Sequence, residues 1–60
     1  MPATFVLQSN SLGDFYFSLQ DEDGETVASS EIYDSREAAL NGIEAVRRSA
    51  ATATVDDQTA

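Results

Sequence analysis

The acidic side chains between residues 21 and 34 are the first candidates for chemistry. Asp21 and Asp23 precede Gly24, an arrangement found inside calcium-binding loops. A loop with Gly24 at its sixth position would begin at Leu19 and end at Ser30, where calcium binding requires carboxylates. Because the register fails, we interpret the segment as an acidic turn and predict no metal site.

Acid–base and nucleophilic catalysis lack their usual residues. The chain has no His, no Cys and no Lys, so Ser29, Ser30 and Ser35 have no neighbour of the type that activates a hydroxyl. The carboxylates of Glu31 and Asp34 could do acid–base work only in a desolvated pocket, for which so small a domain has little room. We expect no enzymatic activity and no cofactor.

The charge balance limits the classes of partner. Eleven Asp and Glu residues oppose three Arg residues, the net charge is −8 at pH 7, and the first 35 residues hold seven acids and no base. Such a surface repels nucleic-acid phosphates. No stretch approaches the roughly 20 apolar residues of a membrane span, and the first residues do not resemble a signal peptide. The expectation is a cytoplasmic protein that binds neither nucleic acid nor membrane.

The same acidity permits two interpretations. In a salt-rich, halophilic cytoplasm the screening length falls to about 3 Å at 1 M salt, which would relieve the repulsion among these carboxylates. The alternative is an acidic protein without salt adaptation.

Three strands in an antiparallel meander are predicted to position these groups. Residues Thr4–Ser9 form an apolar run, and Asp14–Gln20 alternates almost strictly between apolar and polar side chains. Gly13 and Gly24 end turn-forming segments after these two runs. The third strand is predicted over Glu25–Tyr33, with a bulge where its alternation falters at the two central serines and Glu31.

An amphipathic helix follows over residues 36–49. Asp34 or Ser35 is its N-cap, and Asp34 would complete a capping box with Glu37. Gly42 costs about 1 kcal/mol in a helix, which predicts that the helix backbone passes close to the sheet or to a second helix. The alternative is a glycine that the helix tolerates without such a contact. The predicted core consists of Phe5, Leu7, Phe15, Phe17, Leu19, Ile32, Leu40, Ile43 and Val46.

A chain of 60 residues is marginal by itself. A domain of this size buries only about 60% of its unfolded surface, and disulfides are excluded, so association with a second copy is expected. Residues Thr52–Val55 are either part of a frayed segment or a short strand that needs a sheet edge. Candidate dimer-interface residues are Gly42, Ile43, Val46, Thr52, Ala53, Thr54 and Val55, and candidate partner-surface residues are Tyr16, Tyr33 and Asn41.

Part of the sequence resembles a known family. The spacing Phe17-x-Leu19, Asp23-Gly24-Glu25, Ser30-Glu31-x-Tyr33-x-Ser35 and Ala38-Ala39-x-Asn41-Gly42-Ile43-x-x-Val46 is similar to that of the YegP-like family of small prokaryotic proteins of unknown function. The likeness covers roughly residues 5 to 50.

The resemblance implies an α+β fold. It consists of a three-stranded antiparallel β-meander, one amphipathic helix and a short C-terminal strand (β-β-β-α-β). It further implies that two copies share one sheet and exchange their C-terminal strands, with one unit over residues 1–56 and a flexible tail over 57–60. It brings no catalytic or binding residues. Members commonly carry basic residues at the outward positions of the second strand, where this chain has Tyr16, Ser18 and Gln20.

The preferred function is that of a non-catalytic homodimeric interaction or accessory protein, which binds a protein partner through the dimer surface. The alternative is a small-ligand binder that uses a groove between the two helices near Asn41 and Gly42.

Overall fold

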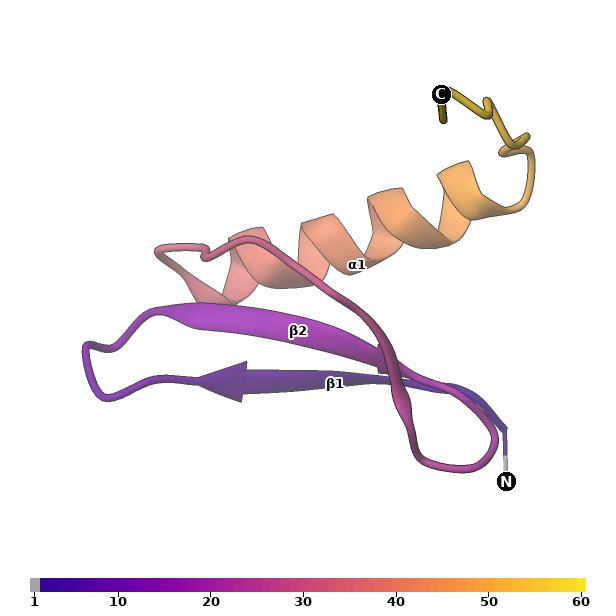
Figure 1. Cartoon of the computed structure of the whole chain (residues 1–60). Helices are drawn as coiled ribbons and strands as arrows, with labels where there is room; N and C mark the ends of the chain where they lie inside the picture. The colour runs from indigo at the N-terminus through magenta and orange to yellow at the C-terminus, as the bar shows by residue number, and fades with distance from the viewer. Residues whose placement is uncertain (1) are drawn as a thin grey trace.

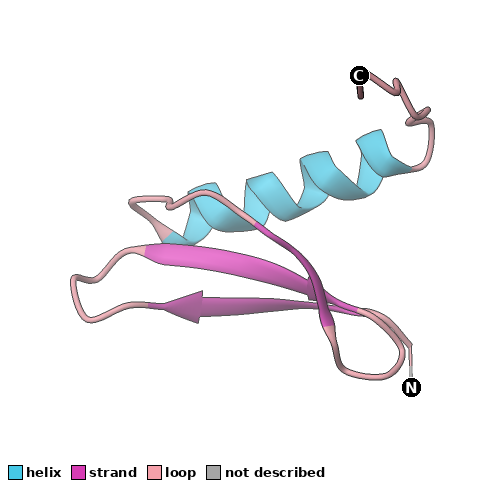
Figure 2. Ribbon diagram, viewed as in Figure 1, coloured by secondary structure: helices cyan, strands magenta, loops and turns pink. Residues whose placement is uncertain are grey.

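The computed structural model describes residues 2–60 as one sheet with one helix laid across it (Figure 1). The elements are β1 (Thr4–Ser9), β2 (Phe15–Gln20), β3 (Thr26–Ser29) and α1 (Arg36–Ala50). The strands are antiparallel and lie in the order β1-β2-β3, and α1 lies on one face of the sheet (Figure 2). The predicted α+β meander and helix are confirmed for this part of the chain.

Both hairpin turns close by the same mechanism. The Asn10 side-chain oxygen accepts the N–H of Asp14 at 3.0 Å, and the Asn10 carbonyl accepts the N–H of Gly13 at 3.1 Å. In the second turn the Asp21 carboxylate accepts the N–H of Glu25, and the Asp21 carbonyl accepts the N–H of Gly24. Both glycines have positive φ, 83° and 85°, which a residue without Cβ adopts freely. The predicted turns are confirmed, and the Asp21 carboxylate accepts hydrogen bonds from the backbone of its turn.

The third strand is shorter than predicted. β3 pairs with β2 only over Thr26–Ser29, with a register shift opposite Leu19 and Gln20, and the chain rejoins β2 in one isolated bridge between Tyr33 and Phe15. Between the pairings of Ser29 and Tyr33, residues 30–32 lie opposite only two residues of β2, so the bulge predicted at the serines and Glu31 is confirmed. The register shift at Val27 is a second irregularity that was not predicted. Ile32 lies in the detour before Tyr33 and is 58% exposed, so its placement in the core was wrong.

The core of a single copy is small. Among the described residues, Phe17 (5% exposed) and Ala39 (0%) are the buried hydrophobic ones, and Ser18 is the buried polar one. The other predicted core residues of the sheet, and Ile43, are half-buried. Leu40 and Val46 remain exposed on α1, Val46 by 39%. The apolar faces predicted from the sequence point inward, yet one copy does not cover them.

The helix begins one residue later than a capping box requires. The N-cap is Ser35, which has extended backbone angles and whose Oγ accepts the N–H of Ala38 at 3.0 Å. With Ser35 as N-cap, the third helical residue is Ala38 rather than Glu37, so the capping box of Asp34 was wrong. After α1 the chain makes one turn, and residues 53–60 form neither helix nor strand in this copy.

Candidate functional site

A groove opens between the C-terminal half of α1 and the β2–β3 side of the sheet. Its volume is about 240 Å³. The residues that line it are Phe5, Phe17, Leu19, Ala28, Ser29, Ser30, Glu31, Tyr33 and Val46. It is therefore an apolar, aromatic hollow with a polar rim at Ser29–Glu31.

The groove exists because the helix covers only part of the sheet. α1 packs against β1 and β2 and makes no contact with β3. The apolar positions of β2 thus have a neighbour on the β1 side and open space towards β3. Val46 reaches the groove from the helix.

Three aromatic rings form the wall and floor of the groove. The ring centroid of Phe17 lies 6.0 Å from that of Phe5 in an edge-to-face arrangement, and 6.0 Å from that of Tyr33 with the rings nearly parallel at 16°. Both geometries are favourable for aromatic pairs. Tyr33, predicted as a partner-contact residue, thus lies half-buried on the helix side of the sheet; contact with a partner stays a prediction.

Gly42 lies directly over this aromatic wall. A Cβ added at Gly42 would stand 2.8 Å from Cζ of Tyr33 and 3.2 Å from Cε2 of Phe17, and closer still to the Tyr33 hydroxyl. The predicted close approach is confirmed, and the structure attributes it to the tyrosine and the sheet of the same chain. Contact of Gly42 with a second copy stays a prediction.

The polar rim is held by Ser30. The Ser30 Oγ accepts the N–H of Phe17 at 2.9 Å and donates to the carbonyl of Glu31 at 2.7 Å. The hydroxyl thus takes the place of a backbone carbonyl in the β2–β3 ladder, which lets the strand bulge without leaving the amide of Phe17 unpaired. This role of Ser30 was missed from the sequence, where the faltering alternation was its only signal.

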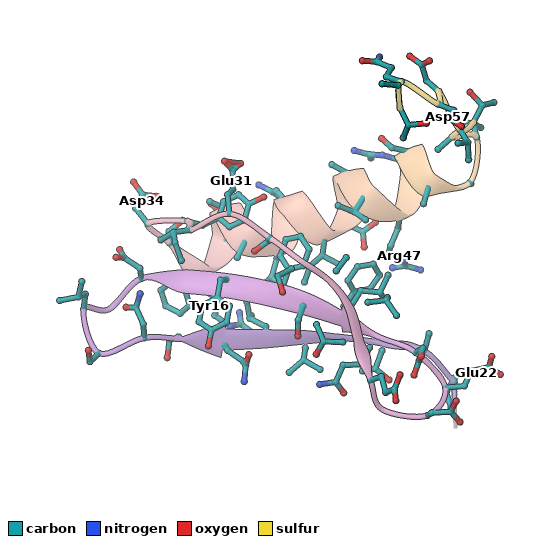
Figure 3. The ribbon with its side chains drawn as sticks, in the orientation of Figure 1. Tyr16, Glu22, Glu31, Asp34, Arg47 and Asp57 are labelled. Atoms are coloured by element: carbon teal, nitrogen blue, oxygen red, sulfur yellow. The ribbon has the colours of Figure 1, made fainter. Side chains whose placement is uncertain are left out.

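Glu31 is the one charged residue among those that line the groove. Glu31 and Asp34 are exposed on the connection between β3 and α1 (Figure 3). A second hollow, of about 300 Å³, lies at the acidic turn and is lined in part by Asp21 and Asp23. Between Pro2 and Ala60 no three side chains of the metal-binding types are grouped to hold an ion.

The remaining predicted residues lie apart from the groove. Tyr16 is half-buried on the sheet face away from α1 (Figure 3), the face predicted for it. Asn41 is exposed on the helix beside Gly42. Residues 52–55 are exposed beyond the end of α1, with Val55 94% exposed. The structure thus brings Tyr33, Gly42 and Val46 together and leaves the other candidates separate.

Three further features concern the charged side chains and the length of the helix. The Thr59 hydroxyl and then its backbone N–H, at 2.7 and 3.0 Å, hydrogen-bond to the Asp57 carboxylate and lower its pKa. Glu44 pairs with Arg47 at 2.9 Å on the exposed side of α1. Within the described chain no helix has the length and apolar character needed to cross a membrane.

Comparisons with known proteins agree with the fold. Residues 10–57 match a domain of unknown function, DUF1508. The chain is 42% identical over 48 residues to the UPF0339 protein PA0329 of Pseudomonas aeruginosa, covering 80% of this chain and 44% of that protein. It is 34% identical over 50 residues to a UPF0339 protein encoded in the 5′ region of the ptx operon of Stutzerimonas stutzeri, covering 83% and 45%.

A solved structure has the same architecture. The solution structure of a protein from Haloferax volcanii superposes with a TM-score of 0.81 at 30% identity, covering 93% of this chain and 95% of that one. The chain spans less than half of each curated relative but nearly all of the Haloferax protein. The resemblance to YegP-like proteins is confirmed, and the chain belongs to the DUF1508 family of proteins of unknown function.

Proposed function

We propose that the protein is a non-catalytic interaction module that works as a homodimer and binds a protein partner through the dimer surface. The observation that carries the proposal is the apolar surface that one copy leaves open. Val46 lines an open groove, Leu40 is exposed on the same helix, and Val27 and Ile32 are exposed at the sheet edge. Exposed apolar surface of this kind marks interaction sites in small soluble domains.

The lengths of the relatives support self-association. Each curated relative is more than twice as long as the segment that this chain matches, so each has room for a second unit in one chain. Two copies of the present chain would likewise supply two units, and each copy would bury apolar surface of the other.

Exchange of residues 52–55 is the contact we infer between the copies. The β1 edge is the better acceptor, because Thr4–Ser9 carries no charge whereas acidic side chains flank β3 on both sides. Asp56 and Asp57 directly follow the exchanged segment and would be repelled from those carboxylates. A β-prone segment on a neutral edge gains ladder hydrogen bonds without this repulsion.

A mixed-label NMR experiment tests the exchange. Copies labelled with ¹³C and unlabelled copies are combined, and filtered spectra report only contacts between copies. We expect contacts between Val55 and side chains of β1, and we expect Val55→Asp to remove them while Gln58→Asp, a matched change outside the predicted strand, leaves them. Absence of any contact between copies in the unsubstituted protein would contradict the proposal.

The groove favours one alternative function, the binding of a small apolar ligand. This groove lies within one chain, between α1 and the sheet. It is distinct from the groove between two helices predicted from the sequence, which stays a prediction. A volume of about 240 Å³ is slightly below the usual range of ligand sites. In an NMR ligand screen, shifts confined to Phe5, Phe17 and Tyr33 would favour this alternative, and shifts spread along the strands would favour a protein partner.

A further inference from the structure

We propose that the outer edge of β3 binds an extended, positively charged segment of another protein, which adds to the sheet as a fourth strand. The inference rests on the proposed interaction function and names the chemistry of the partner. It follows from three properties of this edge: its unpaired backbone, the carboxylates at its two ends and the groove beside it.

The backbone of β3 is free on its outer side. All four residues of Thr26–Ser29 are exposed, and no helix covers them. The Ser30 N–H points inward to the Phe17 carbonyl at 2.8 Å, so in an antiparallel ladder the N–H and carbonyl of Ser29 point outward. An outward pair of this kind is what an added strand binds.

The charges at this edge select a basic segment. Four acids stand at the β2–β3 turn and two follow β3, which together are six of the eleven acids in the chain. Figure 3 shows Glu22 at one end of this segment and Glu31 at the other. The opposite edge, β1, carries no charge. A segment with Lys or Arg near its ends therefore matches β3 and not β1.

The groove gives the added strand an apolar contact. Ala28, Ser29, Ser30 and Glu31 line the groove as well as forming or following the edge. Because side chains alternate between the faces of a strand, every second residue of the added segment would face the groove and Val46. The recognised pattern is thus alternating basic and small apolar residues. Residues 52–60 of a second copy contain no base and two acids, and fit this edge poorly.

The probe is a synthetic ten-residue peptide of alternating Arg and Val, compared with one of alternating Thr and Val. Amide hydrogen exchange of the protein is measured with each peptide at 0.1 M salt. We expect the Arg peptide to slow exchange at Ser29 by at least about tenfold, because a new hydrogen bond forms there. Ser30, whose N–H is already bonded, should change little. The neutral peptide should bind at least about fivefold more weakly.

Two charge-matched double variants separate a local site from general attraction. The variant Glu25→Gln with Glu31→Gln removes two acids at the edge, and the variant Asp56→Asn with Asp57→Asn removes two acids elsewhere. All four side chains are exposed, so folding should be retained. We expect the first variant to bind the Arg peptide about fivefold more weakly and the second less than twofold.

Three outcomes would overturn the inference. Equal weakening by both double variants would show that only net charge matters. Protection of residues in β1 instead of Ser29 would place the peptide on the wrong edge. Slow exchange at Ser29 before any peptide is added would show that a second copy already occupies β3. Contacts between copies, measured without peptide as above, report the dimer separately, so failure of one proposal does not imply failure of the other.

Discussion

Gly42→Ala should have two opposite effects on stability, one through helix propensity and one through packing. In an unobstructed helix, this change stabilises by about 1 kcal/mol because alanine loses less backbone entropy. Here the new methyl group would stand 2.8 Å from Cζ of Tyr33 and 3.2 Å from Cε2 of Phe17, distances that force the rings to move. Overpacking of this kind costs about 1–3 kcal/mol.

The aromatic ring of Tyr33 has little freedom to yield. The Tyr33 carbonyl accepts the N–H of Phe15 at 2.8 Å, and the Tyr33 N–H donates to the Phe15 carbonyl at 2.7 Å. The Tyr33 ring also stacks on Phe17. We therefore place the packing cost near the upper half of its range and expect Gly42→Ala to lower the free energy of unfolding by about 1 kcal/mol net.

Urea unfolding at one fixed protein concentration measures the effect, since association would shift the midpoint. Asn41→Ala is the matched control, because this exposed neighbour on the same helix gains helix propensity without a contact and should stabilise by about 0.5 kcal/mol. Tyr33→Phe removes the atom nearest to the new methyl group, so the cost of Gly42→Ala should fall in that background. Stabilisation by Gly42→Ala equal to that of the control would refute the close approach.

Three further predictions concern the ladder, the charge and the acidic carboxylate after the helix. Ser30→Ala leaves the buried amide of Phe17 without its acceptor and should lower the free energy of unfolding by about 1–3 kcal/mol. The control Ser29→Ala, at an exposed position, should change the free energy of unfolding by less than about 0.5 kcal/mol. Equal effects of the two variants in urea unfolding would count against the ladder role of Ser30. With a net charge of −8, the melting temperature should rise between 0.1 and 2 M potassium chloride as repulsion is screened, and a flat response would reject salt adaptation. Because hydrogen bonds from Thr59 lower the pKa of Asp57, their contribution is present above the ordinary carboxyl pKa and is lost as the pH falls through the lowered one; an NMR titration should show the Asp57 midpoint rising in Thr59→Ala, and an unchanged midpoint would contradict the assignment.

Most of the fold could be predicted because its signals are local. Near-strict alternation in residues 14–20 predicts β2, and an Asn or Asp followed three residues later by Gly predicts each turn. The spacing of apolar residues predicts α1, and the unexpected Gly42 predicts a close contact. Each of these features is decided by residues that are neighbours in the sequence.

The groove could not be predicted, because it depends on which strands the helix covers. The spacing of apolar residues does not indicate that α1 lies over β1 and β2 and leaves β3 uncovered. The detour that exposes Ile32 depends on Ser30, whose side chain replaces a carbonyl in the ladder. The faltering alternation indicates that the strand is irregular there, but it does not indicate this hydrogen bond. The capping box failed for a smaller reason, because two adjacent residues could each cap the helix and Ser35 does so.

The claim that one copy is incomplete is tested most directly by sedimentation equilibrium at low micromolar concentration, with the chain shortened by residues 51–60 run in parallel. We expect the full chain to sediment as a folded species at twice 6.4 kDa and the shortened chain to be monomeric and poorly folded. A compact, cooperatively folding species at 6.4 kDa would contradict the account, because a single copy would then hold its shape with its apolar groove open to water.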